Sequence, residues 1–286
     1  MPVPRRPAVA GQFYVADAAA LTRQVEGCFL DPRGPGELPA RHRAADRSLV
    51  AGVVPHAGFE YSGPIAAHLY SLIARQRAPA TVLILGVDHH AASRGASLSR
   101  VEWRTPLGPV AVDEALVDAL DRPPLRVDEA AHRAEHSIEV QLPFLEYVVP
   151  HPRMVALEVP FGPLDYLLEV GARVAEGVRD RDVLLLASSD FSHYIPAEEA
   201  RRLDRLAIDA ILTGDPARLY ETVLSNDISM CGIAPTTVLL GALRGRPLTR
   251  RLLRWGHSGE VVRMPEVVGY AAIALEEATA GAAPVK

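Results

Sequence analysis

The sequence predicts a single three-layer α/β domain, in which helices flank a central sheet that is mostly parallel or mixed. Two observations predict this fold class. Continuous apolar, β-branched runs recur along the chain, and such runs are typical of strands that are covered on both faces. Segments of helical periodicity separate these runs over the whole length, which favours one α/β domain over residues 1–286, with its core at about residues 7–275.

Five segments are expected to be strands, because each is an apolar run of strand length with many β-branched residues. They are SLVAGVVP (48–55), TVLILG (81–86), MVALEVP (154–160), DVLLLAS (182–188) and VVGYAAIAL (267–275).

Seven segments between these runs are expected to be helices. Asp17 suits an N-cap, and four prolines suit first-turn positions, where the missing N–H costs no hydrogen bond. These prolines are Pro64, Pro163, Pro216 and Pro235. The expected helices cover residues 17–29, 64–75, 136–148, 163–177, 197–212, 216–224 and 235–243.

Two polar or irregular segments complete the organisation of the chain. The Pro/Gly-rich segment 31–47 comes too early to separate two full domains, so we expect a surface loop. Residues 279–286, TAGAAPVK, are expected to form a flexible C-terminal tail.

Composition argues against several classes of protein. The net charge is −5 and the arginines are scattered, whereas nucleic-acid binders usually carry a basic face. The N-terminus lacks the apolar core of a signal peptide and no run reaches the length of a membrane span, so we expect a cytoplasmic protein. Cys28 and Cys231 are too few for a disulfide scaffold, and Cys28 is expected to pack in a helix.

Three of the expected strands end in residues that titrate or bind metal ions. Ligands of open α/β sheets bind outside the carboxyl ends of the strands, so these loops are expected to converge on one site. A single histidine after a strand is often only a hydrogen-bonded loop residue, but three such ends favour a divalent metal site. Two histidines with one anionic group are typical of non-haem iron enzymes. The residues are His56, then Asp88, His89 and His90, then Ser188, Ser189, Asp190 and His193.

The segment AEHSIEVQLPFLEYV adds further titratable groups. On a helix, Glu135 and Glu139 share one face, and His136 lies beside Glu139. Acids at a helix N-terminus interact favourably with the helix dipole, which accounts for Glu135 but not for His136.

Cys231 precedes the expected helix at 235–243. A thiol near a helix N-terminus ionises more readily, and the thiolate is the form that binds metal. Most cysteines in such apolar surroundings are inert packing residues, so both interpretations stay open for Cys231.

The stretch HRAEH at residues 132–136 reads as H-x-x-E-H, the inverted zincin pattern of zinc hydrolases. This hypothesis needs a well-formed helix that carries both His132 and His136. The surrounding sequence indicates that a helix is only beginning there, so zinc hydrolysis is the least favoured function.

The motifs together resemble the Memo family, whose prokaryotic members are often labelled component B of the AmmeMemoRadiSam system. The matching stretches occur in order from about residue 7 to residue 275. They are AVAGQFYVAD, VVPHAGFEYSGPIAAHLY, ILGVDHH, EHSIEVQLPFLE, ASSDFSHY, MCGIAPTTVLL and VGYAAIAL.

The resemblance implies a fold like that of the class III extradiol dioxygenases, which are non-haem iron enzymes. It also implies that the metal ligands are His56, His89 and Cys231. By the same resemblance, Asp190, His193 and His136 line the pocket, and His193 acts as the acid or base near the substrate. Fe(II) is the expected metal, with Cu or Zn as alternatives, because a thiolate makes softer metals more competitive.

Two residues depart from the family pattern. The paired histidines usually follow GPN or GPS, whereas this chain has GVD, so Asp88 is expected to orient an imidazole or to add charge to the site. Glu60 stands where a tyrosine is common and adds an acid near the expected pocket mouth.

The resemblance leaves two main functions open. The first is an iron- or copper-dependent oxidoreductase of dioxygenase type. The second is a non-enzymatic module that binds a metal or peptide in a pocket retained from the dioxygenase fold, since a fold does not establish a reaction. Expected partners are a small molecule or peptide, a radical-SAM enzyme of the same pathway, and a second copy in a homodimer, with no nucleic acid and no membrane.

Overall fold

Four parallel strands form the centre of the sheet. β1 (Leu49–Val54) pairs with β8 (Val183–Ser188), β8 pairs with β2 (Thr81–Val87), and β2 pairs with β7 (Arg153–Val159). Almost every residue of these strands is buried, as expected for strands with both faces covered. Their carboxyl ends lie at one edge of the sheet, which brings the loops after β1, β2 and β8 together.

The computed structural model describes residues 3–40 and 44–278. Two long antiparallel strands, β10 and β11, and several short strands extend the centre of the sheet. On one side β11 runs antiparallel to β1, and β10 runs antiparallel to β11. On the other side β3 runs antiparallel to β7. The sheet is therefore mixed, as predicted. The added strands are β3 (Ser97–Leu98), β4 (Trp103–Thr105), β5 (Gly108–Val112), β6 (Arg126–Val127), β9 (His193–Ile195), β10 (Leu248–His257) and β11 (Val267–Glu277).

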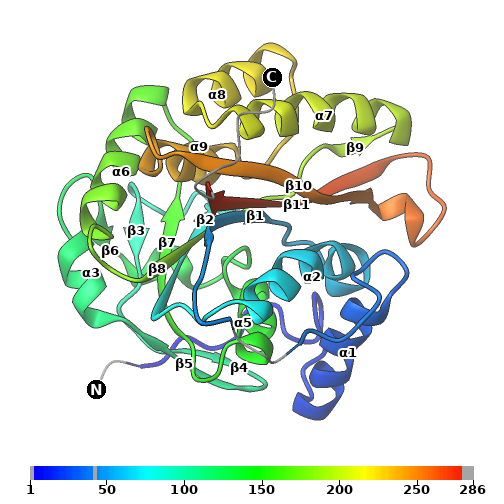
Figure 1. Ribbon diagram of the computed structural model, residues 1–286, viewed down its shortest axis with the longest axis horizontal. Coiled ribbons are helices and arrows are strands. Elements are labelled where there is room, and N and C mark those ends of the chain that lie inside the picture. Colours follow the sequence, from blue (N-terminus) through cyan, green and yellow to red (C-terminus); the bar gives the residue numbers. More distant parts are fainter. Residues whose placement is uncertain (1–2, 41–43, 279–286) are drawn as a thin grey trace.

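Helices cover both faces of the sheet (Figure 1). They bury two hydrophobic clusters, one on each face. The first layer contains α1 (Ala18–Leu30), α2 (Phe59–Arg75) and α5 (Leu142–Val148). The second layer contains α3 (Glu114–Leu120), α6 (Leu164–Gly177), α7 (Ala197–Thr213), α8 (Pro216–Ser225) and α9 (Ile233–Ala242). Short helical turns are α4 (Glu129–His132), η1 (Glu139–Gln141) and η2 (Ser258–Glu260). These layers confirm the predicted three-layer α/β architecture.

Helix α2 begins five residues earlier than expected. Pro64 lies inside the helix rather than in its first turn, so the carbonyl of Glu60 loses its usual partner, the N–H four residues on. The guanidinium of Arg33 donates to this carbonyl at 3.2 Å. A side chain from the 31–47 segment thus satisfies the group that Pro64 leaves free, and the helix continues through the proline.

The expected helix at 136–148 is shorter in the structure. Residues 133–138 form turns and irregular backbone, and only η1 and α5 are helical. Glu135 therefore does not share a helical face with Glu139. The two carboxylates point to different partners, Glu135 toward His89 and Glu139 toward Arg5.

Side-chain caps define several helix starts. The carboxylate of Asp17 accepts from the N–H of Ala20 at 2.8 Å, as predicted from its position before α1. At α8 the carboxylate of Asp215 caps the helix, and Pro216 occupies the first turn.

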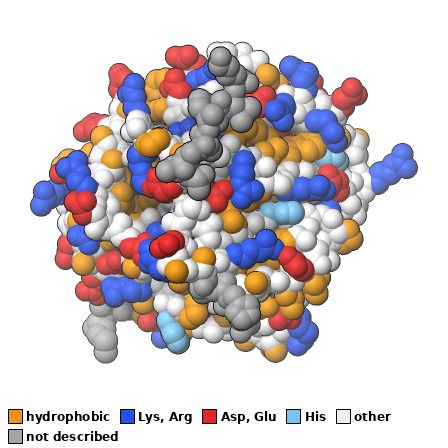
Figure 2. Space-filling view, in the orientation of Figure 1, with side chains coloured by type: hydrophobic (Ala, Val, Ile, Leu, Met, Phe, Trp, Pro, Cys, Tyr) orange, Lys and Arg blue, Asp and Glu red, His pale blue; other side chains and the backbone are white. Residues whose placement is uncertain are grey.

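Charges are mixed on the surface. Figure 2 shows basic and acidic side chains interspersed on the visible face, in keeping with the scattered arginines of the sequence. Among residues 3–40 and 44–278, no helix has the length and apolarity needed to cross a bilayer. The predicted tail at 279–286 lies outside the described residues.

Glu146 on α5 provides a test of pH-dependent stability. Burial raises the pKa of Glu146 from 4.5 to about 7, and the hydrogen bond from Thr105 lowers it only in part. Because the folded protein holds this proton more tightly than the unfolded chain, its contribution to stability is complete below pH 4.5 and is lost as the pH rises to about 7.

Glu146→Gln should remove this dependence. As the pH rises from 5 to 8, the free energy of unfolding of the variant is expected to increase by roughly 1–2 kcal/mol relative to that of wild type, after a discount for the partial exposure of Glu146. Urea unfolding at both pH values measures the difference, and the exposed Glu221→Gln serves as control. Parallel pH profiles of wild type and Glu146→Gln would contradict the assignment.

Candidate metal site

The three polar strand ends meet at the carboxyl edge of the sheet. His56 follows β1, His89 follows β2, and Asp190 follows β8. The rings of His56 and His89 lie 5.2 Å apart between centroids, and the backbone N–H of His56 donates to the carboxylate of Asp190 at 2.8 Å. Residues that are far apart in the sequence thus form one cluster, as the strand ends indicated.

His56 is held by contacts on both ring nitrogens. Its Nδ1 lies 3.0 Å from the hydroxyl of Ser188, and its Nε2 lies 3.2 Å from Sγ of Cys231. Burial lowers the pKa of His56 well below its ordinary value, and the neighbouring His136 and His89 lower it further. The ring is therefore neutral, which is the form of histidine that binds metal.

Glu135 orients His89. Nδ1 of His89 lies 3.0 Å from the carboxylate of Glu135, and the backbone N–H of His89 donates to the same group at 2.9 Å. Burial alone would raise the pKa of Glu135, but the hydrogen bonds from His89 and from the backbone N–H of Ser137 outweigh it, and the pKa is lowered. The ionised carboxylate accepts from Nδ1 and leaves Nε2 of His89 free to bind a metal.

His136 lies beside both histidines. Its ring stacks on that of His89 with centroids 4.6 Å apart and meets that of His56 edge-on at 5.5 Å. Burial lowers the pKa of His136 to about 4. Donor atoms of His56, His89 and His136 all lie within 4.8 Å of one another, so these three form a candidate metal-binding group among the described residues.

Cys231 lies next to this group, and of the two interpretations left open for it, burial does not favour the easily ionised thiol. It precedes α9 by two residues, yet burial and the charge of Asp190 raise the pKa of Cys231 well above its ordinary value. The backbone N–H of Asp190 donates to Sγ at 3.3 Å. Proximity to a helix terminus does not outweigh burial here, so the metal-free side chain is a neutral thiol. A bound cation would reverse this balance, because a coordinating thiol loses its proton.

Asp190 lies on the loop after β8, and His193 begins β9. Burial raises the pKa of Asp190 to about 6, although backbone N–H groups of His56 and Ala57 lower it in part. Nδ1 of His193 lies 2.8 Å from the carbonyl oxygen of Ser229. Since a carbonyl only accepts, Nδ1 of His193 carries a hydrogen, and in the neutral ring the lone pair is on Nε2.

Part of the donor set fits a divalent metal ion: His56, His89 and His136 form a group of close donors, whereas Cys231 is in neither such group among the described residues. Donors bound to one ion at about 2.0–2.3 Å lie roughly 3–4 Å apart, and Nε2 of His56 and Sγ of Cys231 lie 3.2 Å apart. His56 and His89 each engage another group through Nδ1, the arrangement that commonly supports metal-bound histidines. A second group of donors, His90, Glu135 and His136, also lies within 4.8 Å. There Glu135 is already occupied by His89 and by two backbone N–H groups.

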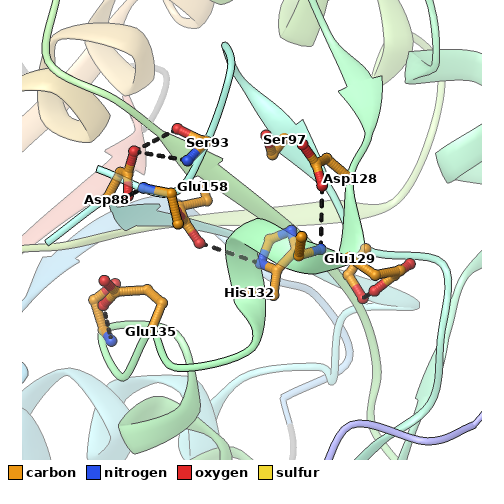
Figure 3. A network of polar contacts seen from close by, with 12 residues as sticks. Asp88, Ser93, Ser97, Asp128, Glu129, His132, Glu135 and Glu158 are labelled. Carbon is orange, nitrogen blue, oxygen red and sulfur yellow. Dashed lines mark hydrogen bonds and ion pairs between the residues drawn. The ribbon is translucent and has the colours of Figure 1, made fainter. Parts of the chain in front are cut away.

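Asp88 does not orient the adjacent imidazoles, contrary to the expectation. Its carboxylate accepts from the N–H of Ala92 at 2.9 Å and from the N–H and hydroxyl of Ser93. Figure 3 shows Asp88 turned toward Ser93 and Glu158. Asp88 thus stabilises the turn that follows it. Glu135, which is 46 residues from His89 in the sequence, orients the His89 ring.

His132 lies apart from the metal-binding groups. Helix α4 ends at His132, so no helix carries both His132 and His136 as the inverted zincin pattern requires. The ring is 1% exposed, and its Nδ1 faces the carboxyl of Glu158 at 3.5 Å (Figure 3). Burial, with the charges of Glu135 and Asp88, raises the pKa of Glu158 to about 9. The zinc-hydrolase hypothesis therefore has no support in this arrangement.

Glu60 lies in the first turn of α2 and is exposed. It lines a surface pocket of about 280 Å³ together with residues of the N-terminal segment. The sequence did not point to Ser229, which contacts His193, or to Gln141, which contacts Ser188 behind His56. Ser188 ends a buried strand, a position that signalled proximity but not its contact with His56.

Comparisons with known proteins find relatives over nearly the whole chain. A family model described as Memo-like protein matches residues 5–274. The MEMO1 family protein MK0963 of Methanopyrus kandleri is 41% identical over 277 residues, which cover 94% of this chain and 98% of that protein. The MEMO1 family protein MTH_45 of Methanothermobacter thermautotrophicus is 39% identical over 274 residues, covering 93% and 98%.

A solved structure shares the fold. The uncharacterized protein JW3007 of Escherichia coli K12 superposes with a TM-score of 0.53 at 16% identity, covering 79% of this chain and 99% of that one. At this identity the likeness concerns the fold alone. The family match over nearly the whole chain and the identities near 40% show that this chain belongs to the Memo family.

Proposed function

We propose that this chain is a mononuclear metalloprotein in which His56 and His89 bind a divalent metal through Nε2. One observation carries the proposal: both histidines are fixed through Nδ1, by Ser188 and Glu135, and their donor atoms lie within 4.8 Å of those of His136. Fe(II) is the proposed metal, with Cu or Zn as alternatives, because imidazoles suit all three.

Cys231 and His136 compete for the third position. Sγ of Cys231 lies 3.2 Å from Nε2 of His56, whereas His136 belongs to the group of three mutually close donors. The family resemblance favours Cys231, and we propose it as the third ligand. His136, with its pKa of about 4, then stands beside the metal as a neutral base.

The proposed activity is that of an oxidoreductase of the dioxygenase type, acting on a small molecule or peptide in this pocket. A bound Fe(II) ion would supply redox chemistry and a positive charge that binds an anionic substrate group. Nε2 of His193 is placed to accept a proton, since Nδ1 donates to the carbonyl of Ser229. Asp190, with a pKa of about 6, is the other group placed to exchange a proton near neutral pH.

Metal content tests the proposal and the identity of the third ligand. After anaerobic purification, wild type should contain close to one equivalent of iron. Cys231→Ser should lose most of it, because a hydroxyl binds the ion far more weakly than a thiolate. His136→Gln should keep it. Mass spectrometry of the three proteins measures the content.

Three outcomes would change the account. Loss of metal in His136→Gln with retention in Cys231→Ser would assign the third position to His136. Failure of wild type to bind Fe(II), Cu or Zn would contradict the metalloprotein and favour a binding module. Metal bound without any oxygen-dependent turnover would contradict the oxidoreductase alone.

A further inference from the structure

A fully buried chain of polar side chains lies behind His56. The hydroxyl of Tyr70 donates to Oε1 of Gln141 at 2.9 Å, and Nε2 of Gln141 lies 2.9 Å from the hydroxyl oxygen of Ser188. The Ser188 oxygen in turn lies 3.0 Å from Nδ1 of His56. Each of these four residues is at most 2% exposed, so water does not compete for their hydrogen bonds.

The orientation of Gln141 follows from its partners. Its second amide contact, at 2.9 Å, is the carbonyl oxygen of Pro55, which can only accept. The amide nitrogen therefore faces Pro55 and Ser188, and Oε1 faces Tyr70. Gln141 thus donates one N–H to the oxygen of Ser188.

Ser188 has one hydrogen to donate, and it is already assigned. Its oxygen lies 2.7 Å from the carbonyl oxygen of Ser137, which has no hydrogen, so the O–H of Ser188 must point there. With Gln141 donating to one lone pair, only an acceptor position remains for His56. Nδ1 of His56 must therefore carry the hydrogen, because the other tautomer would set two lone pairs against each other.

We infer that Ser188 and Gln141 are positioning residues that fix the tautomer of His56. They hold the hydrogen on Nδ1 and direct the lone pair of Nε2 toward Cys231. The thiol of Cys231 then has two acceptors within reach, Nε2 of His56 at 3.2 Å and the carbonyl oxygen of Asp190 at 3.6 Å, and the Nε2 lone pair is the nearer of the two. The same lone pair is the one that a metal ion needs, and this second consequence rests on the proposed function.

Nitrogen-15 NMR of the metal-free protein tests the tautomer directly. With labelled histidine, and with His56 assigned by comparison with His56→Asn, wild type should show a protonated Nδ1 and an unprotonated Nε2. A hydrogen on Nε2 of His56 would overturn the inference. This measurement uses the unaltered chain and does not depend on metal binding.

Substitutions test the positioning role of Ser188 and Gln141. In Ser188→Ala the hydrogen of His56 should no longer be confined to Nδ1, so both tautomers should be populated and the ring nitrogens should show intermediate nitrogen-15 shifts. The variant should also bind Fe(II) roughly 10- to 100-fold more weakly. Ser71→Ala is the matched control, because it removes another buried hydroxyl, one without a hydrogen-bond partner in the described structure. Tautomer and affinity like those of wild type in Ser188→Ala would overturn the positioning role.

A second variant guards against misfolding of Ser188→Ala. Gln141→Met keeps the length of the side chain and removes the N–H that occupies Ser188, so it should also shift the ring nitrogens of His56. If Gln141→Met leaves them unchanged, Gln141 has no positioning role. Metal-free wild type with Nδ1–H on His56 but no metal affinity would contradict the proposed function and leave the tautomer assignment standing.

Discussion

His56→Ala is expected to lower the affinity for Fe(II) by about 100- to 1,000-fold, if a binding free energy on the order of 10–16 kcal/mol is shared among about four ligands. The effect should be this large because Nε2 of His56 lies 3.2 Å from Sγ of Cys231, and His56 belongs to the group of close donors. Anaerobic titration with Fe(II), followed by competition with a chelator, measures the loss.

Two control variants make this result specific. His151→Asn removes a histidine near the amino end of β7, far from the carboxyl edge, and asparagine suits the left-handed backbone there, where φ is 48°. His90→Ala removes a member of the second donor group. Both should bind Fe(II) like wild type. Unchanged affinity in His56→Ala, or a loss in His90→Ala alone, would place the metal elsewhere.

Glu139→Gln should destabilise the fold by about 3–5 kcal/mol, the usual cost of leaving one charge of a buried pair unpaired. The carboxylate of Glu139 is 0% exposed and bonds Arg5 at 2.7 Å. It also accepts from the N–H groups of Ala8 and Val9 and from the hydroxyl of Tyr14. One buried carboxylate thus holds the N-terminal segment against the rest of the domain.

Thermal and denaturant unfolding at pH 7 measure this loss. Glu199→Gln is the matched control, because Glu199 forms an exposed pair with Arg202 and its neutralisation should leave the melting temperature almost unchanged. Equal melting temperatures for Glu139→Gln and wild type would contradict the anchoring role. Arg5 also donates to the carbonyl of Glu135, so Glu139→Gln should weaken metal binding as well.

Elements with a strong local signal were predicted well from the sequence. Buried strands such as β2 and β8 were recognised because continuous apolar runs are explicit in the residues themselves. Strand β10 was missed because its exposed positions carry arginines, for example Arg251 and Arg254, and edge strands lack the apolar continuity of central ones.

From the residues alone the site was predicted only to the level of its strand ends, and the family resemblance added Cys231 and His136, which lie beside His56. His56, His89 and Asp190 were brought together because parallel strands share a carboxyl edge. Asp88 was expected either to orient an imidazole or to add charge to the site, and the first of these roles belongs to Glu135 instead, because a neighbour in sequence is visible and a neighbour in space is not. Glu135 reaches His89 across 46 residues.

Ionisation was also beyond the reach of the sequence. The position of Cys231 before α9 suggested an easily ionised thiol, whereas burial raises its pKa. Burial depends on every segment that packs around a residue, so a local motif does not reveal it.

Anomalous diffraction at the iron edge, on crystals grown anaerobically with Fe(II), locates the bound metal. One strong peak is expected within about 2.0–2.3 Å of Nε2 of both His56 and His89, the distance of a metal–nitrogen bond. A peak among His90, Glu135 and His136 without contact to His56, or no peak at all under these conditions, would contradict the proposed metal site.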